Sequence, residues 1–159
     1  MVEGEIAICQ ATVADVDDLV RLRRVMCEGM GWDDPVKLEA MEQAASAYFL
    51  QAIPAGDFCG WLAVTPAGEA VSTGGVIVDR HIPTPANPSG KVGYILNIAT
   101  VPSHRRQGIA RRVLQTILAW LDKQGVQRAT LHTSDEGRPL YESLGFEPVP
   151  NEMRLEIGQ

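Results

Sequence analysis

Hydrophobic residues recur at helical spacing in some segments of the chain and alternate with polar residues in others. Apolar positions three or four residues apart predict helices, and period-two alternation predicts strands. Glycine and proline mark the boundaries between these segments. The predicted elements are a strand over 5–10, helices over 12–29 and 35–53, strands over 58–65, 70–80 and 91–101, a helix between Gly108 and Gly125, a strand over 127–134, a short helix over 138–145 and a strand over 152–157.

The strand predicted over residues 91–101 is apolar on both alternating faces. Such a strand is typical of the centre of a sheet that is covered on both sides. The order of elements therefore predicts an α+β or mixed α/β fold, with helices packed on a sheet. Residues 82–90 contain three prolines and predict a loop long enough to cover something. Without repeats or low-complexity tracts, residues 1–159 are predicted to form one domain.

Composition and charge exclude several classes of protein. The 159 residues are 45% hydrophobic and carry a net charge of −6, which argues against a nucleic-acid-binding domain. The apolar runs are shorter than the roughly 18 residues that a membrane span requires. Acidic residues stand near the start, where a signal peptide would place basic ones, so we expect a cytoplasmic protein. The three cysteines lack the spacing of a metal site, and no metal is expected.

Four arginines fall between residues 105 and 112, in a segment without any acid. Helix starts normally favour acidic residues, because the helix dipole is positive there. The reversed charge predicts a bound anion on the exposed amides, which Gly108 and Ala110 are small enough to let approach. Solvated surface arginines are the alternative. The chain contains neither a P-loop nor a dinucleotide-binding glycine motif.

Two segments together resemble a known family. Residues 105–110 (RRQGIA) are similar to the R/Q-x-x-G-x-G/A signature of the GNAT superfamily of acyl-CoA-dependent N-acyltransferases. Residues 140–146 (LYESLGF) resemble that family's second signature, at the helix after the fifth strand. The resemblance extends from about Gly93 to Phe146, and before that it rests on the order of elements.

The resemblance implies a splayed, mostly antiparallel mixed sheet of six to seven strands flanked by about four helices. It also implies acetyl-CoA as co-substrate, with the pyrophosphate on the amides of residues 106–110. Pantetheine would pair with the backbone of residues 98–100, where a strand amide would stabilise the oxyanion. The cofactor-binding residues implied in this way are Ile98, Ala99, Thr100, Arg105, Arg106, Gln107, Gly108, Ile109, Ala110, Arg111 and Ser134.

Tyr141 matches the tyrosine that protonates the departing thiolate in this family, although a half-buried helix aromatic is the alternative. The general base is less evident. Some members carry a glutamate early in the fourth strand, where this chain has Tyr94, and residues 92–101 contain no acid. His132 is one candidate base, because histidine changes its charge near neutral pH, but a lone strand histidine is more often structural.

Glu28 and Asp33 are the other candidate bases, and both are also expected to line the acceptor site. They stand with Asp34 between the first two helices, where an acidic lining would attract a cationic amine. Solvated helix-end charges, with Asp34 as a cap, are an equally good interpretation. The predicted function is acetyl transfer to a primary amine of a small molecule or peptide, directly within a ternary complex. A non-catalytic acyl-CoA-binding or sensor domain is the alternative, and the resemblance also allows a homodimer.

Overall fold

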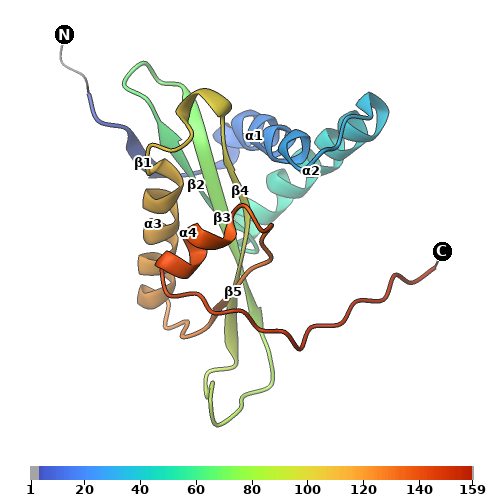
Figure 1. The fold of residues 1–159 in the computed structure, drawn as a ribbon, viewed down its shortest axis with the longest axis vertical. Helices are drawn as coiled ribbons and strands as arrows, with labels where there is room; N and C mark the ends of the chain where they lie inside the picture. Colours follow the sequence, from blue (N-terminus) through green and yellow to red (C-terminus); the bar gives the residue numbers. More distant parts are fainter. Residues whose placement is uncertain (1–3, 159) are drawn as a thin grey trace.

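A five-stranded sheet runs through the middle of the protein in this computed structural model, which describes residues 4–158 (Figure 1). The strands follow one another across the sheet in the order of the sequence. The first four pair antiparallel, and the fifth lies parallel to the fourth. They are β1 (Ala7–Gln10), β2 (Cys59–Val64), β3 (Ala70–Arg80), β4 (Lys91–Thr100) and β5 (Ala129–Thr130).

Capping side chains begin the 3₁₀ turn ahead of the first helix and also begin the second helix, as the sequence predicts. Thr12 and Asp15 form the predicted capping box, and the Asp34 carboxylate accepts hydrogen bonds from the amides of Val36 and Lys37. Two short 3₁₀ turns accompany the helices. The full set is η1 (Val13–Asp15), α1 (Val16–Gly29), α2 (Pro35–Ala55), η2 (Pro102–His104), α3 (Ile109–Lys123) and α4 (Arg138–Ser143).

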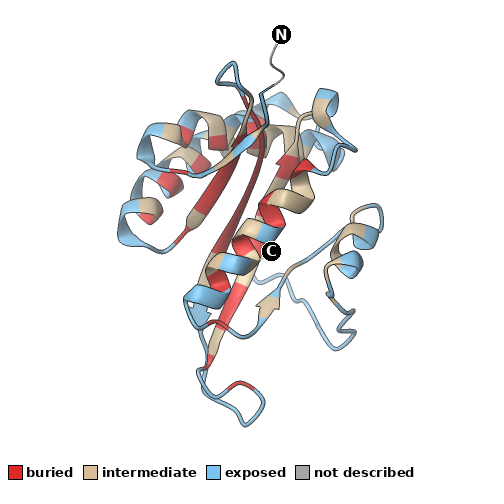
Figure 2. Cartoon of the chain, turned by 90° about the vertical axis from the view of Figure 1, so that its left-hand side faces the viewer, coloured by how far each residue is buried: buried red, intermediate tan, exposed pale blue. Residues whose placement is uncertain are grey.

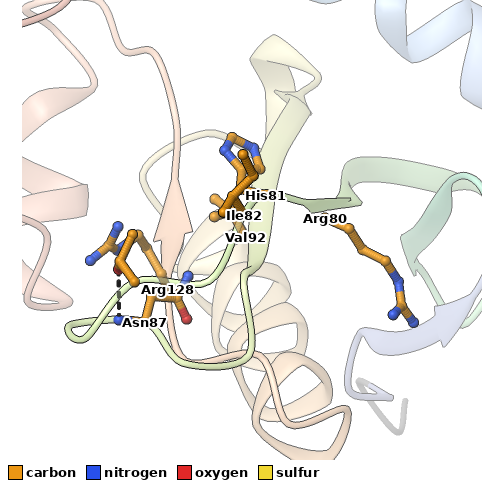
Figure 3. A pocket seen from close by; sticks show the side chains of 7 residues that line it. Arg80, His81, Ile82, Asn87, Val92 and Arg128 are labelled. Carbon is orange, nitrogen blue, oxygen red and sulfur yellow. Dashed lines mark hydrogen bonds between the residues drawn. The ribbon is translucent and has the colours of Figure 1, made fainter.

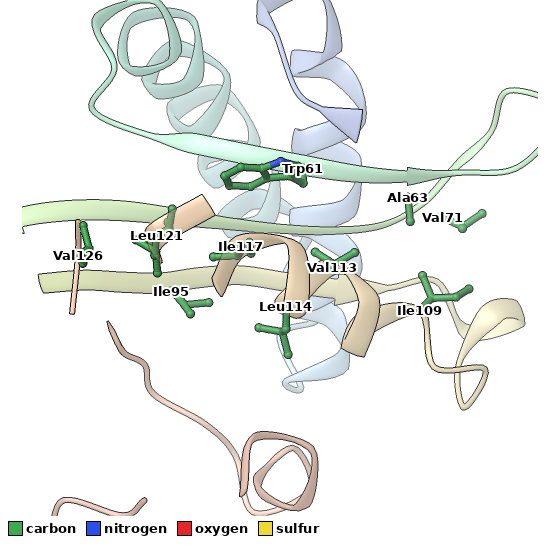
Figure 4. Packing of buried hydrophobic residues seen from close by; sticks show 11 residues of the cluster. Trp61, Ala63, Val71, Ile95, Ile109, Val113, Leu114, Ile117, Leu121 and Val126 are labelled. Carbon is green, nitrogen blue, oxygen red and sulfur yellow. The ribbon is translucent and has the colours of Figure 1, made fainter. Parts of the chain in front are cut away.

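Helices α1 and α2 cover one face of the sheet, and α3 covers the other (Figure 1). Alternate residues of β2 serve the two layers: Trp61 packs in the cluster under α3, whereas Leu62 packs in the cluster under α1 and α2. Both clusters are buried (Figure 2). Figure 4 shows Val113 and Ile117 of α3 in the cluster that also contains Trp61. The strand predicted over 91–101 is covered on both faces as β4: nearly all the residues on one face are buried, and most of those on the other face are of intermediate exposure.

Glycines let α3 lie close to the sheet. A Cβ atom on Gly74 of β3 would come within 2.8 Å of Val113, and one on Gly93 of β4 would come within 2.8 Å of Leu121. No real side chain tolerates such contacts, so both positions favour glycine on packing grounds. The close packing of α3 on β3 and β4 therefore depends on these glycines.

Strands β4 and β5 separate after a very short contact. They pair only at Gly93 with Ala129 and at Tyr94 with Thr130. Asn97 has a φ of 60°, and the β3–β4 register shifts between Thr73 and Gly75, which bends β4. The predicted strand over 127–134 is thus reduced to two residues, and β4 has no second strand neighbour in residues 4–158 beyond Tyr94.

The predicted strand over residues 152–157 is wrong. This segment forms no strand; beyond Glu152, whose carboxylate contacts His132, it extends away from the sheet (Figure 1). Its apolar residues Met153, Leu155 and Ile157 are 95%, 81% and 88% exposed. A segment of alternating polar and apolar residues forms a strand only where a sheet edge can pair with it. Strand β5 is too short to provide such an edge. The sheet accordingly has five strands, not six to seven, while the α+β class is confirmed.

The proline loop over residues 82–90 joins β3 to β4 at the end of the sheet where Arg80 pairs with Lys91. The start of α3 lies at the opposite end, where Ser72 pairs with Thr100 (Figure 1). The loop therefore does not cover the arginine-rich segment. Among the described helices, none combines the length and apolarity needed to cross a bilayer.

Candidate functional site

The segment that leads into α3 places several backbone amides side by side. Arg106 and Gly108 both have left-handed backbone conformations, with φ values of 61° and 76°. Such residues turn successive N–H groups toward a common side and form a concavity for anions. Gly108 is the N-cap of α3 and provides no capping side chain, and the Arg112 amide makes the first bond of the helix, 3.2 Å to the Gly108 carbonyl. We call the backbone amides of residues 106–111 the amide cradle.

The amide cradle is open to solvent. Residues 105–108 are exposed, whereas Ile109 is only 4% exposed and anchors the start of the helix in the core. A Cβ atom placed on Gly108 would project into open space, with no described atom within 4 Å. The first amides of a helix have no partner within the helix and carry the positive end of its dipole. The cradle thus fits a phosphate group, and its occupation by one stays a prediction.

Three of the four arginine side chains donate hydrogen bonds to other parts of the protein around the cradle. Arg105 donates from Nε to the Thr100 carbonyl at 3.0 Å, and its Nη2 lies 3.8 Å from where a Cβ on Gly29 would be. Arg112 donates to the Ile6 carbonyl at 2.8 Å. Arg111 donates to the Ser143 hydroxyl and so links the first turn of α3 to α4.

These arginine contacts qualify the expectation that the whole cluster meets the anion. Arg106 is exposed beside the cradle, and it is the arginine best placed to add its charge to a bound phosphate. Gln107 is exposed too, and its side-chain amide donates to the Ser103 carbonyl at 3.4 Å. Ala110, in the first turn, is partly buried.

The edge of β4 that faces away from β3 is unpaired from Ile95 onward within the described chain. It includes Ile98, Ala99 and Thr100, the residues predicted to pair with pantetheine. On the β3 side, the Ser72 hydroxyl donates to the Ala99 carbonyl at 2.9 Å and lies 2.8 Å from the Thr100 hydroxyl. These contacts hold β4 against β3. Although the Thr100 carbonyl already accepts a hydrogen bond from Arg105 at 3.0 Å, no strand pairs with the opposite edge, which is able to bind an extended ligand as an added strand.

Tyr141 lies on α4, two residues before the serine that binds Arg111. Its ring packs edge-on against Phe146, with 6.0 Å between ring centroids, and against the core cluster under α3. Burial raises the pKa of the Tyr141 phenol. The hydroxyl therefore stays protonated at neutral pH and is able to donate a proton. Ser134, before α4, accepts a hydrogen bond from the Gly137 amide at 3.3 Å.

The acidic residues predicted to bind the acceptor lie at the end of α1. The Glu28 carboxylate is 3.3 Å from Arg24, so its charge is partly compensated, and Asp33 is exposed. Asp34 caps α2, as expected if this residue is a helix cap rather than part of the acceptor site. Because Arg105 reaches Gly29, the end of α1 lies beside the loop that carries the cradle.

His132 lies just beyond the last paired residue of β5 and makes two polar contacts. Its Nδ1 is 2.9 Å from the Tyr94 hydroxyl of β4. Its Nε2 is 2.6 Å and 2.7 Å from the two carboxylate oxygens of Glu152 in the tail. His132 is predicted from the sequence as a candidate base, and Tyr94 is noted separately from it. Glu152 is not predicted, because no local pattern connects the tail with β5.

Asn97 is a second residue that the sequence analysis misses. It is 4% exposed at the bend of β4, and its Oδ1 accepts a hydrogen bond from Arg23 of α1 at 3.2 Å. Its Nδ2 has no hydrogen-bond partner in the described chain. Asparagine tolerates a left-handed backbone better than most residues, and a polar residue inside an otherwise apolar strand is the signal that could have revealed it.

Two surface hollows lie away from these residues. One, of about 580 Å³, lies where the proline loop joins β3 to β4. Its lining includes Arg80, His81, Asn87 and Arg128 (Figure 3). In Figure 3 the Arg80 side chain points away from Arg128. The other, of about 510 Å³, lies between α3 and β1–β2. Within residues 4–158, no group of three or more His, Cys, Asp or Glu side chains could hold a metal ion.

A sequence model described as the Acetyltransferase (GNAT) family matches residues 18–146, which is most of the chain. The match includes the amide cradle, the unpaired edge of β4 and Tyr141. The chain belongs to the GNAT acetyltransferase family. The resemblance noted in the sequence is thereby confirmed.

Solved structures share this fold across almost the whole chain. A GCN5-related N-acetyltransferase from Ralstonia eutropha is 28% identical, with a TM-score of 0.85 over 97% of this chain and 100% of that one. A predicted acetyltransferase from Clostridium acetobutylicum, solved with acetyl-CoA, is 23% identical, with a TM-score of 0.87 over 96% of this chain and 97% of that one. At that identity, the second similarity is one of fold alone.

Among curated proteins, the glucosamine 6-phosphate N-acetyltransferase of Trypanosoma brucei brucei is 25% identical over 92 residues. That match covers 58% of this chain and 60% of the relative. The chain spans 40% and 60% of the length of two curated relatives that it matches.

Proposed function

We propose that this GNAT protein transfers an acetyl group from acetyl-CoA to a primary amine, directly within a ternary complex. The observation that carries the proposal is the amide cradle, which is uncapped and open at the start of α3. Family membership supports the same conclusion. The cradle amides would hold the pyrophosphate, with Arg106 adding its charge, and the unpaired edge at residues 98–100 would hold pantetheine.

The chemistry requires an acid at the sulfur and a donor at the carbonyl oxygen. The neutral amine attacks the acetyl carbon, a carbon–nitrogen bond forms, and the carbon–sulfur bond breaks. A backbone amide on the unpaired edge of β4 would stabilise the oxyanion of the intermediate. Tyr141 would donate its phenolic proton to the departing sulfur and regain one from the nitrogen as the amide forms.

Direct transfer is favoured over an acyl-cysteine intermediate. A cysteine nucleophile needs a lowered pKa, whereas burial raises the pKa of the Cys9 and Cys59 thiols. Cys9 lies on β1, Cys27 on α1 and Cys59 on β2, so none of the three belongs to the cradle or to the unpaired edge of β4. The acetyl group would therefore pass directly from sulfur to nitrogen, without an acyl-enzyme.

The acceptor that we favour is a small molecule with a primary amine. The named activity of the Trypanosoma relative, on glucosamine 6-phosphate, supports this class over a peptide. Glu28 and Asp33 would attract the cationic amine toward the end of α1, which lies beside the cradle loop.

The test is to incubate the purified protein with acetyl-CoA and a panel of amino sugars, polyamines and peptides while free thiol is measured. We expect thiol release with at least one amine, and loss of that signal in Gly108→Asp, whose carboxylate would repel the pyrophosphate. CoA binding without turnover on any amine would instead favour the acyl-CoA sensor. That alternative draws support from β4, where Tyr94 stands in place of the family glutamate.

A further inference from the structure

We propose that Tyr94, His132 and Glu152 form a proton relay that takes the proton from the acceptor amine. The inference rests on the proposed acetyl transfer and identifies the base that this reaction needs. The three side chains come from β4, from the segment after β5 and from the tail, and they form one continuous line of hydrogen bonds. The Glu152 carboxylate was not predicted from the sequence. Its contact with Nε2 fixes the orientation and the tautomer of the His132 ring.

The hydrogen bonds determine which nitrogen acts as the base. An ionised carboxylate only accepts hydrogen bonds, so the 2.6 Å contact places a proton on Nε2 of His132. The neutral ring then has its lone pair on Nδ1, which accepts the hydrogen bond of the Tyr94 hydroxyl at 2.9 Å. The relay is thus set to accept one proton through Tyr94.

Proton transfer balances in a single step. The ammonium group of the acceptor gives one proton to the Tyr94 oxygen while Tyr94 passes its own proton to Nδ1 of His132. The products are a neutral amine and an imidazolium, which keeps both hydrogen bonds and is stabilised by the Glu152 charge. The His132 and Glu152 side chains are 49% and 61% exposed, so the imidazolium can release its proton to solvent afterwards.

The relay lies where β4 and β5 begin to separate. Tyr94 is the last β4 residue paired with β5, and His132 stands two residues beyond its partner Thr130. Tyr94 alternates with Ile95, which packs under α3, and shares the opposite face with Leu96, which packs under α1 and α2. Helix α1 contacts β4 on that face, and Glu28, which the proposed function assigns to the amine, lies in its last turn. Tyr94 would therefore touch the substrate, while Glu152 is a positioning residue.

The decisive variant is Glu152→Gln, with Glu156→Gln, an exposed carboxylate of the same tail, as its matched control. Glu152→Gln should lower kcat about tenfold, since one charge-assisted hydrogen bond is lost. His132→Gln and Tyr94→Phe should each lower kcat about 100-fold. CoA affinity should stay at the wild-type value in all four variants.

An NMR spectrum of the ¹⁵N-labelled histidine ring measures the relay independently of turnover. The His132 signals, assigned by their absence in His132→Gln, should show the proton on Nε2 in the wild type, because Nε2 donates to Glu152 and Nδ1 accepts from Tyr94. In Glu152→Gln that preference for one tautomer should weaken, whereas Glu156→Gln should keep the wild-type tautomer. An active enzyme whose Glu152→Gln variant keeps both the wild-type kcat and the wild-type tautomer overturns the relay alone. A wild-type protein that binds CoA but acetylates no amine overturns the proposed function and the relay together.

Discussion

Replacing Gly108 by alanine separates the backbone preference of the cradle from its binding of an anion. The φ of Gly108 is 76°, and an added Cβ would meet no described atom within 4 Å. The cost to the free protein is therefore the left-handed backbone of a residue with a side chain, about 1 kcal/mol. In a chain of this length, that cost should lower the Tm by about 2–4 °C.

The effect on CoA affinity should be larger, because the new methyl group would stand over the amides that meet the pyrophosphate. A hydrogen bond to a charged group contributes about 1.5–3 kcal/mol. Loss of one such bond corresponds to about 10- to 100-fold weaker binding. Isothermal titration calorimetry with CoA measures the affinity, and differential scanning calorimetry measures the Tm of the same preparation.

Gly125→Ala is the matched control. Gly125 follows the other end of α3, has a φ of 72°, and an added Cβ there would also enter open space. It should lose about the same 1 kcal/mol of stability and keep the CoA affinity of the wild type. If Gly108→Ala binds CoA as tightly as Gly125→Ala does, the cradle does not hold the pyrophosphate, and the assignment of residues 106–111 is refuted.

The remaining predictions concern α4 and the core. Tyr141→Phe should lower kcat about 100-fold with little change in CoA affinity, and an unchanged rate would make Tyr141 a packing residue. Because burial raises the pKa of Tyr141 above 10.0, its neutral form stabilises the fold below that pH. The free energy of unfolding should therefore fall as the pH rises above 10, and less steeply in Tyr141→Phe. Leu114→Ala, at a fully buried site, should cost about 3 kcal/mol in denaturant unfolding and partly buried Leu118→Ala less.

The sequence predicts the helices and the cradle well, because their determinants are local. The side chains of Thr12, Asp15 and Asp34 accept hydrogen bonds from amides only a few residues away. The cradle likewise needs only a helix start without acids and a glycine able to adopt a left-handed backbone. Helical periodicity in α3 is enough to predict its buried face, since all its buried residues follow that spacing.

Strand predictions are poorer wherever a partner is needed. The alternating residues of 152–157 would form a strand only against an edge, and β5 pairs over too few residues to supply one. The same short pairing leaves one edge of β4 without a strand partner. The resemblance to the GNAT family implies such an open edge, whereas the period-two alternation of β4 gives no sign of it. Whether a strand pairs is decided by segments distant along the chain.

The amino-acid sequence by itself determined the helices, the apolar pattern of the central strand and the glycine start of α3 on which the predicted anion site depends, since each is read from residues close in the chain. The tertiary structure decided how far β4 and β5 pair, and it joined Tyr94 to His132 across 38 residues and His132 to Glu152 across 20. Periodicity and capping act over about one or two helical turns. Contacts over such separations exist only once the sheet has brought its strands and the tail together.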